Sequence, residues 1–222
     1  MGGSLGPQHL QFLAQGAAWT LALSLVALLG GGLLGFALAL CRVSPLRAVR
    51  VGTGVLVQLV QGTPLLVLMF LAFFGMPALG WRLTPFQAAG GALVIYTAAY
   101  LGEIWRGCIE AVPRPQWEAA EGLALSRLQR MRHVVLPQAV RIAAPPTVGF
   151  LVQIVKNTSL ASVVGFVELM RAGQVLNNTL FQPFAIYAII ALGYFAMCYP
   201  LSLWSRRLEA RRAAPARLAA AP

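Results

Sequence analysis

The chain has 222 residues, of which 59% are hydrophobic and only 10% are charged, and its formal net charge is +11. A soluble domain usually carries about 25% charged residues, so this composition excludes an ordinary soluble domain. The positive charge alone is compatible with nucleic-acid binding. The distribution of the arginines along the chain favours a membrane protein instead.

Long uncharged runs divide the chain into segments that can cross a membrane. They cover residues 10–41, 51–81, 83–102 and 172–205. A further apolar stretch, 142–167, is interrupted only by Lys156 and is the fourth run in chain order, which makes 172–205 the fifth. Each can hold the roughly 20 apolar residues that cross a bilayer as a helix. The first run is too long for a signal-peptide core, and no basic region precedes it. The sequence therefore predicts an all-α membrane protein with five transmembrane helices.

The arginines are distributed unevenly between the two sides of the predicted membrane. Fourteen follow the first, third and fifth runs: Arg42, Arg47, Arg50, Arg106, Arg114, Arg127, Arg130, Arg132, Arg141, Arg206, Arg207, Arg211, Arg212 and Arg217. Only Arg82 and Arg171 fall on the other side. Because basic residues accumulate in cytoplasmic loops, we expect an external N-terminus and a cytoplasmic C-terminus. The basic charge would then face anionic lipid headgroups.

The only long polar connection covers residues 109–144. Pro115 suits the first turn of a helix, and residues 116–125 then fit a helix with a small apolar face. That face is formed by Trp117, Ala120, Leu123 and Ala124. The pattern predicts one short helix in the first half of the connection.

A second short helix is predicted directly after the first. Ser126 and Gln129 have the spacing of a capping box, which marks a helix start. Pro137 is expected to end this helix, because proline lacks a backbone N–H and disfavours helix at the residue before it. Such a pair of helices either docks a protein partner or lies on the lipid surface. Periodicity alone does not decide between these two alternatives.

Lys156 and the three residues that follow it, Asn157, Thr158 and Ser159, form a polar cluster in an apolar run. A charge at membrane depth is costly and usually faces the protein interior or a wet cavity. We therefore interpret the cluster as lining a solute pathway. The alternative is that the span ends near Val155 and that Lys156 reaches the outer surface. A single cation among neutral hydrogen-bonding groups suits a carboxylate, so the expected solute is neutral polar or acidic and not cationic.

Two further features concern the second and third runs. Glu103 and Arg106 are one helical turn apart, and a structural ion pair between them is favoured over contact with cargo. Pro64, which follows Gly62 and Thr63, is expected to kink the second span.

The chain lacks the motifs of several enzyme classes. It has one lysine, and Asn157 follows it, so no phosphate-binding loop that ends in Gly-Lys-Ser/Thr is possible. Its two histidines, His9 and His133, are too far apart for a His-Glu-x-x-His metal site. Cys41, Cys108 and Cys198 are also widely separated, which favours packing thiols over a disulfide framework.

Several motifs resemble one family of membrane transporters and appear in that family's order. They are Gly62-Thr63-Pro64-Leu65-Leu66, Tyr100-Leu101-Gly102-Glu103-Ile104 with Arg106-Gly107, Gln116-Trp117-Glu118-Ala119-Ala120, Val134-Val135-Leu136-Pro137 with Gln138-Ala139, and Lys156-Asn157-Thr158-Ser159-Leu160. As a set they resemble the permease subunits of ATP-binding-cassette (ABC) importers. The resemblance covers roughly residues 58–168 and is to the branch for polar amino acids of the histidine, glutamate, glutamine and arginine type. The sequence departs from the family pattern at Gln61, usually arginine, and at Pro115 and Ala124, both usually glycine.

This resemblance implies a type I ABC importer permease fold of five transmembrane helices. The expected permease domain covers residues 1–212, with a coupling loop of two short helices at about 109–144 and a disordered cytoplasmic tail at 213–222. No cofactor and no catalytic site of its own are implied. Two cytoplasmic ATPase subunits, an extracytoplasmic substrate-binding protein and a second permease, identical or related, are the expected partners in the bacterial inner membrane.

The matching motifs also imply roles for particular residues. Coupling to the ATPase is expected at Gln116, Trp117, Glu118, Ala119, Ala120, Ala124, Leu136 and Pro137. The substrate pathway is expected at Gln61, Thr63, Pro64, Lys156, Asn157, Thr158 and Ser159. Glu103 and Arg106 are expected to pair, and no metal site is expected.

Two other classes of function compete with this interpretation. A stand-alone secondary transporter or channel for a small polar solute often shows two related halves and charges in several spans. This chain shows only Lys156. An intramembrane enzyme needs a nucleophile and a base at membrane depth, for which only Ser159 with Lys156 is conceivable.

Overall fold

A computed structural model describes the backbone of residues 5–219 and the side chains of residues 5–210. Its α-helices are α1 (Pro7–Arg42), α2 (Arg47–Gln61), α3 (Leu65–Phe70), α4 (Pro85–Glu110), α5 (Arg114–Gly122), α6 (Arg127–Gln129), α7 (Leu136–Asn157), α8 (Leu169–Leu180) and α9 (Pro183–Ala219). Two π-helical segments, η1 (Leu71–Gly75) and η3 (Arg130–Val135), and two 3-10 segments, η2 (Met76–Leu79) and η4 (Thr158–Val164), join some of them. The described residues contain no strand, so the predicted all-α class is confirmed.

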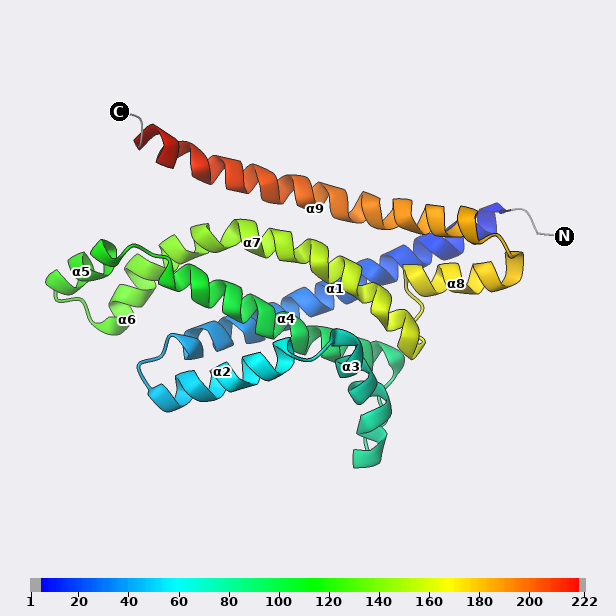
Figure 1. The fold of residues 1–222 in the computed structure, drawn as a ribbon, viewed down its shortest axis with the longest axis horizontal. Coiled ribbons are helices and arrows are strands. Elements are labelled where there is room, and N and C mark those ends of the chain that lie inside the picture. The colour runs from blue at the N-terminus through cyan, green and yellow to red at the C-terminus, as the bar shows by residue number, and fades with distance from the viewer. Residues whose placement is uncertain (1–4, 220–222) are drawn as a thin grey trace.

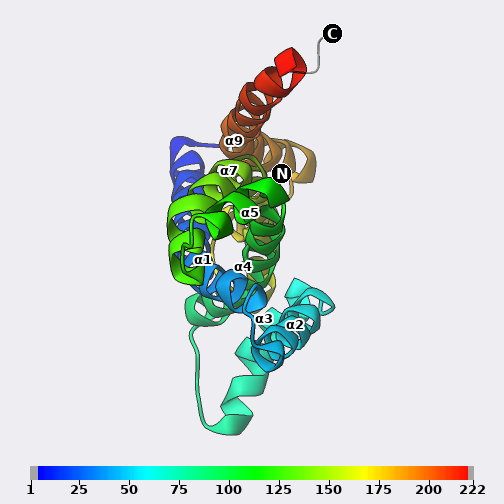
Figure 2. The ribbon, with the colours of Figure 1, turned by 90° about the vertical axis from the view of Figure 1, so that its left-hand side faces the viewer.

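The long helices run along one axis of the molecule (Figure 1). α5, α6 and the C-terminal end of α9 lie at one end, while α8 and the beginning of α1 lie at the other (Figure 1). The end-on view shows α1, α4 and α7 grouped together, with α2 and α3 set off to one side (Figure 2). The arginine-rich segments therefore share one end of the bundle, since α1 and α4 also finish there (Figure 1).

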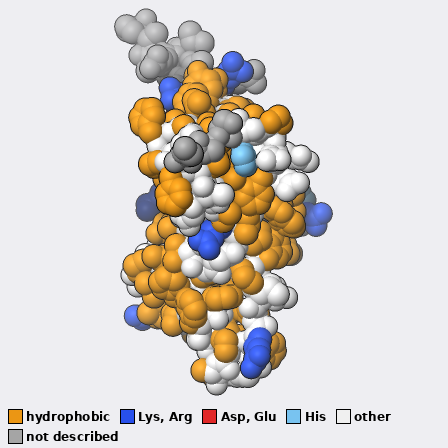
Figure 3. Space-filling model, turned by 90° about the vertical axis from the view of Figure 1, so that its right-hand side faces the viewer, with side chains coloured by type: hydrophobic (Ala, Val, Ile, Leu, Met, Phe, Trp, Pro, Cys, Tyr) orange, Lys and Arg blue, Asp and Glu red, His pale blue; other side chains and the backbone are white. Residues whose placement is uncertain are grey.

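The opposite end of the molecule is largely apolar. Figure 3 shows this end, with hydrophobic side chains over most of the described surface, scattered basic side chains and no acidic side chain in view. The absence of acidic groups from this visible face fits the burial of Glu168, which lies just before α8 and has 0% of its surface exposed.

α1 and α4 form the closest helix pair because glycine lets their backbones approach. A Cβ added at Gly31 would lie 2.5 Å from the Cβ of Thr97, and one added at Gly35 would lie 3.0 Å from the carbonyl oxygen of Ala98. Either substitution would force the helices apart. Small residues have this use in membrane bundles, where lipid provides no hydrophobic drive for helices to associate.

The helical runs that correspond to the predicted spans differ in length and hydropathy. Three runs are long and apolar enough to cross a membrane: Pro7–Arg42, Arg127–Val164 and Pro183–Ala210. The bent pair Arg47–Gln61 and Leu65–Leu79 would make a fourth. α4 is not among these, although its 26 residues reach about 39 Å, enough for a hydrocarbon core of about 30 Å. The order of the helices agrees with the five expected spans. The number of runs that are long and apolar enough to cross a membrane is three, or four with the bent pair, and not five.

The second and fifth spans differ from their expected boundaries. The expected kink at Pro64 is a bend of 94° between α2 and α3. The fifth run, 172–205, is divided into α8 and α9, and the span begins only at Pro183. Phe181 between them has a left-handed φ of 54°, which ends α8. Hydropathy does not detect this break, because α8 is itself amphipathic and apolar on one face.

Pro137 does not end the second loop helix, so that expectation was wrong. α6, η3 and α7 form one continuous helical run, and Pro137 lies in the first turn of α7. Inside a regular helix the missing N–H of Pro137 would leave a carbonyl without its donor, and the π-helical turn η3 directly before it changes the hydrogen-bond pattern at this point. The wider π-helical turn of η3 leads into α7 and separates it from α6. The expected coupling loop therefore has one separate helix, α5, and a second helical segment that is continuous with α7 in the candidate span Arg127–Val164.

The last helix extends further toward the C-terminus than the composition of the sequence suggested. α9 continues to Ala219, into the tail 213–222 for which disorder was expected. Residues 220–222 lie outside the described part of the chain.

Candidate functional site

α5 presents one packed face and one free face. Trp117 is half-buried and Ala120 is buried, and Trp117 packs on a core that includes Ile109 and Val135. Gln116, Glu118 and Ala119 are exposed on the outer side. No ion pair or hydrogen bond ties Glu118 to another described residue. One face of α5 thus packs on the bundle, and the Glu118 carboxylate on the other face is available for contact with a partner.

The turn after α5 carries two exposed leucines. Leu123 and Leu128 are 75% and 76% exposed. Between them Ala124 has a left-handed φ of 54°, a conformation that suits glycine and costs about 1–2 kcal/mol for other residues. The expectation that Leu123 and Ala124 continue the packed face of the helix was wrong, because α5 ends at Gly122.

Three polar contacts fix this turn on the bundle. The Arg130 guanidinium lies 3.0 Å from the Glu121 carboxylate, which joins α5 to η3. Arg127 donates to the carbonyl of Val43 at 3.1 Å and so anchors the loop to the end of α1. The predicted capping box of Ser126 is present, with Gln129 as its partner. The exposed leucines therefore stand on a rigid support.

Leu136, Pro137 and Gln138 connect the loop to α7. Leu136 packs against the same core as Trp117, and Pro137 is exposed. Gln138 donates to the Gln116 side chain at 3.3 Å. The two motifs of the coupling loop, which are about twenty residues apart in sequence, are thus in direct contact.

Glu103 and Arg106 form an ion pair at the same end of α4, with 2.6 Å between Nη2 and Oε1. The group is larger than the sequence indicated. Arg42 of α1 lies 3.5 Å from the other Glu103 oxygen, and Arg106 also pairs with Glu110. Two carboxylates and two guanidinium groups thus connect α1 with α4.

Lys156 lies at the point where α7 changes into the 3-10 turn η4, with its side chain exposed. It borders two hollows. One, of about 370 Å³, extends along α9 to Ser202 and Arg206. The other, of about 350 Å³, extends toward Ser159 and Tyr187. Tyr194 lines both hollows, so it stands between them beside Lys156.

The three residues after Lys156 do not share one environment. Thr158 is fully buried, and its hydroxyl donates to the Val155 carbonyl at 2.7 Å. Ser159 donates to the Lys156 carbonyl at 2.7 Å and lines the second hollow. Asn157 accepts from Gln153 at 3.0 Å. Thr158 is therefore turned into the protein, while Lys156 and Ser159 face open space.

Glu168 is the centre of a buried polar group beside this cluster. It accepts hydrogen bonds from the backbone N–H groups of Met170 and Arg171, both at 2.9 Å, and from the Tyr194 hydroxyl at 2.6 Å. Thr20 of α1 donates to it at 3.4 Å. Glu168 lies between the membrane-spanning runs, and burial raises the pKa of its carboxyl above the ordinary value.

The motif at the α2–α3 bend makes its polar contacts with α4 and within α2. Gln61 donates to the Ala99 carbonyl at 3.4 Å. Thr63 donates to the Leu59 carbonyl at 2.8 Å, within its own helix. Pro64 is exposed and precedes α3. No hydrogen bond joins these three residues to Lys156 among the described contacts, although Leu65, which follows Pro64, shares a packed core with Ala161 and Val164 of η4.

The positions of several residues near these sites were not predicted from the sequence, although Leu123 was assigned to the apolar face of the first loop helix and Arg206 to the cytoplasmic arginines. Tyr194 and Arg206 border the hollows at Lys156, and Leu123 with Leu128 forms the exposed apolar turn. The leucines carried a detectable signal, since two leucines flank a capping residue in a polar loop. Tyr194 carried none, because it is 38 residues from Lys156 and looks like an ordinary aromatic residue of a span.

The long apolar helices and the bent second span define an integral membrane protein, and the loop at its arginine-rich end offers a supported, exposed face. A family model described as "Binding-protein-dependent transport system inner membrane component" matches residues 31–214. The match covers well over half of the chain, which therefore belongs to this family.

Proteins with similar sequences align with this chain over most of its length. A probable amino-acid ABC transporter permease, YckA of Bacillus subtilis, is 32% identical over 94% of this chain and 92% of its own. A probable glutamine ABC transporter permease, GlnM of the same species, is 36% identical over 86% and 89%. The crystal structure of an amino acid ABC transporter with histidines superposes with a TM-score of 0.87 at 31% identity and covers 92% of this chain and 95% of that chain.

The chain is thus the permease subunit of an ABC importer, with a type I permease fold, and it resides in the inner membrane. Permeases of this family are not enzymes, since ATP is hydrolysed by a separate subunit. They work with an ATPase and with a substrate-binding protein. The MetNI methionine transporter in inward-facing form, at a TM-score of 0.78 and 18% identity, shares the fold alone.

Proposed function

We propose that the loop at 109–144 docks the ATPase through the outer face of α5 and the turn that follows it. The observation that carries this proposal is the pair Leu123 and Leu128, which are apolar, at least three-quarters exposed and rigidly supported. An exposed apolar patch with a polar rim is the usual form of a protein contact. Glu118 and Gln116 supply that rim, and Ala119 allows close approach.

Co-purification with the ATPase tests this proposal. Glu118→Arg places a cation where the partner receives a carboxylate, and disrupting a close charge pair costs about 2–5 kcal/mol. We expect the affinity for the ATPase to fall at least about thirtyfold. Glu209→Arg is the matched control, because Glu209 is also exposed but lies on α9. If both variants assemble with the ATPase equally well, Glu118 does not contribute to the interface.

We further propose that the end of the molecule with α5 and α6 faces the cytoplasm. The segments that carry the fourteen arginines meet at that end, and basic residues accumulate in cytoplasmic loops. The N-terminus, which begins at the α8 end, is then extracytoplasmic. This orientation gives the ATPase access to the loop from the cytoplasm and gives a binding protein access to the α8 end.

A second permease copy, or a close relative, is proposed to cover the arm formed by α3, η1 and η2. Large side chains on this arm and its return are exposed: Leu71 59%, Phe74 64%, Leu79 73% and Trp81 66%. Lipid could cover such side chains. The π and 3-10 turns and the irregular return at 80–84 are tolerated at membrane depth only where protein or a cavity covers them. A partner subunit fits that requirement better than lipid.

The cargo is proposed to be an amino acid, in line with the names of the relatives. Lys156, between two hollows, is the cation that would meet its carboxylate. Ser159 and Tyr194 supply neutral hydrogen-bonding groups. Glu168 is hydrogen-bonded and buried, so it offers no free negative charge to a cationic side chain. A neutral polar or acidic amino acid therefore remains the favoured cargo.

A further inference from the structure

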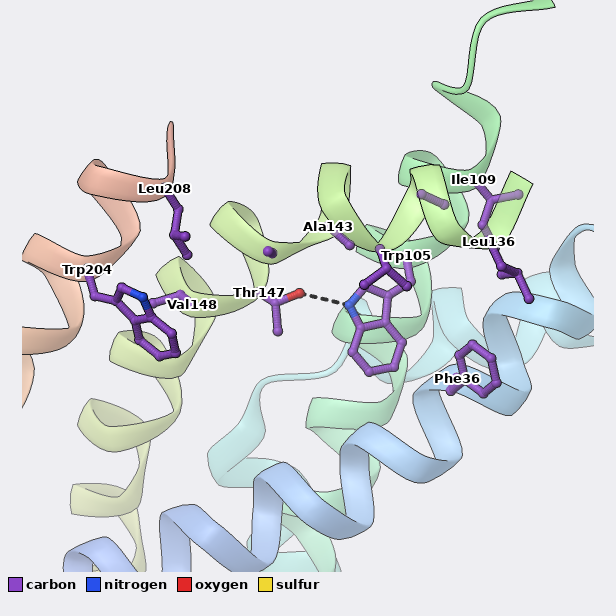
Figure 4. Close-up of a pocket in the computed structure, with 12 residues that line it drawn as sticks. Phe36, Trp105, Ile109, Leu136, Ala143, Thr147, Val148, Trp204 and Leu208 are labelled. Carbon is purple, nitrogen blue, oxygen red and sulfur yellow. Dashed lines mark hydrogen bonds between the residues drawn. The ribbon is translucent and has the colours of Figure 1, made fainter. Parts of the chain in front are cut away.

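An apolar groove of about 440 Å³ lies on α7 near the arginine-rich end (Figure 4). Its floor is made of small residues of α7, among them Ala139, Ala143 and Ala144. Trp204 and Leu208 of α9 border it on one side, and Phe36 and Trp105 border it on the other (Figure 4). Leu136, which also lines the groove, is shared with the expected coupling residues, but the groove does not include the outer face of α5, the turn at Leu123 and Leu128, or the hollows at Lys156.

The groove has no free polar group on its floor. The Trp105 indole N–H donates to the Thr147 hydroxyl at 2.8 Å, so these two groups satisfy each other (Figure 4). The lining residues along α7 run from Leu136 to Val148, which is about 18 Å at 1.5 Å per residue. That length is close to one leaflet of a hydrocarbon core about 30 Å thick. An apolar chain of one leaflet fits this space, and a polar solute does not.

Two arginines lie next to lining residues of the groove in the sequence of α7 and α9. Arg207 is one helical turn from Trp204, and Arg141 is one turn before Ala144, so each lies beside a lining residue. Both are exposed, and neither has an ion pair or hydrogen bond among the described residues. Trp204 is 51% exposed, and tryptophan favours the headgroup level of a bilayer.

A second apolar hollow in the bundle lacks this feature. It lies between α1, α2 and α4, has a volume of about 390 Å³, and includes Ala37. The nearest basic residues there are already engaged. Arg42 contacts Glu103 and donates to the Arg50 carbonyl, and Arg50 donates to the Ser44 carbonyl. Of these two hollows in the described part of the chain, the groove on α7 is the one that combines an apolar floor with unengaged cations.

We propose that this groove binds one acyl chain of an anionic phospholipid, whose headgroup contacts Arg141 and Arg207. The groove faces lipid because Trp204 and Leu208 lie about 200° around α9 from Ser202 and Arg206, which border the hollow at Lys156. The inference rests on the proposed assignment of that opposite face to the transport pathway. A bound lipid at this position would fasten the separated ends of α7 and α9 next to the coupling loop.

Quenching of tryptophan fluorescence by lipids with brominated acyl chains tests the proposal on the full chain. Vesicles of phosphatidylglycerol are compared with vesicles of phosphatidylcholine. We expect stronger quenching by brominated phosphatidylglycerol, and we expect Arg141→Gln and Arg207→Gln each to reduce that preference about fivefold, which corresponds to about 1 kcal/mol per basic residue. Ala143→Phe, which fills the groove, should abolish the preference, and Ala37→Phe in the other hollow should not.

Two results would overturn the proposal. The first is equal quenching by both brominated lipids, unchanged by Arg141→Gln and by Arg207→Gln. Because both arginines are exposed, these two variants still test the proposal if Ala143→Phe fails to fold. The other is an Ala143→Phe variant that loses its permease or ATPase partner while its lipid quenching stays normal, since the groove would then hold a protein. Loss of ATP-driven uptake with an intact lipid preference would instead count against the proposed function alone.

Discussion

Tyr194 of α9 donates its hydroxyl to the buried carboxylate of Glu168 at 2.6 Å, where α8 begins. The same carboxylate caps α8 through two backbone N–H groups, and Thr20 brings in α1. One side chain therefore joins α1, α8 and α9, the last two of which hydropathy reads as a single run. The contact also fixes Tyr194 between the two hollows that border Lys156.

Glu168→Ala should destabilise the permease. The substitution leaves the Tyr194 hydroxyl and two backbone N–H groups without an acceptor in a buried site, and each such group costs about 1–3 kcal/mol. We expect the unfolding temperature of the purified protein to fall by roughly 5–10 °C. Glu209→Ala, an exposed glutamate on α9, serves as the control and should leave it unchanged.

The pH dependence of stability should depend on Glu168. Burial raises the pKa of this carboxyl in the folded protein above its ordinary value of 4.5. The folded state then binds the proton more tightly than the unfolded state, so this contribution to stability is complete at low pH and is lost as pH rises through the folded pKa. The unfolding temperature of the wild type relative to Glu168→Gln should fall as pH rises above 4.5. An identical pH profile for both proteins would contradict the assignment.

Ala124→Gly should make the coupling turn more stable. Glycine adopts the left-handed φ of 54° without the cost of about 1–2 kcal/mol that alanine bears, although its greater freedom in the unfolded chain offsets roughly half of this. We expect slower amide hydrogen exchange in the turn by a few-fold. Ala119→Gly lies in the right-handed helix α5, so the same change there should accelerate exchange. Effects of the same sign at both positions would show that the left-handed turn is not the cause.

Lys156→Met should impair transport, because the stem of the side chain is kept while the cation that meets the cargo carboxylate is lost. We expect uptake in reconstituted vesicles to fall about tenfold or more, with assembly and binding-protein affinity intact. Lys156→Arg keeps the charge and should keep part of the activity. Normal uptake by Lys156→Met, or a wild-type preference for arginine and lysine, would show that this residue does not read the cargo.

The proposed orientation can be checked by cysteine labelling. The native Cys41, Cys108 and Cys198 are first replaced by alanine, and single cysteines are then placed at positions 5 and 215. A membrane-impermeant maleimide added to whole cells or spheroplasts should label only position 5. Labelling of position 215 alone would mean that the arginine-rich end faces outward.

The helices and their caps could be predicted from the sequence because their signals are local. The capping box at Ser126 and the bend at Pro64 depend on residues within one turn. Pro137 was misjudged because a proline ends a helix or begins one, and only the π-helical turn before it decides which. The break before Pro183 was missed because both α8 and α9 are apolar enough to be read as one run.

The site could be predicted only in part, for a similar reason. The free face of α5 and the exposed position of Lys156 follow from nearby residues. Thr20 and Tyr194 meet Glu168 from distances of 148 and 26 residues along the chain, so no spacing in the sequence indicates the contact. The left-handed Ala124 likewise has no sequence signal of its own, since alanine favours a right-handed helix.

The central claim is that this chain moves its cargo only when a separate ATPase drives it. The most direct measurement is amino-acid uptake into vesicles that contain the permease, with ATPase and binding protein each added or omitted, and with proton and sodium gradients imposed in turn. We predict uptake that requires ATP, the ATPase and the binding protein together, and no uptake from either gradient alone. Gradient-driven uptake by the permease without the ATPase would contradict this account.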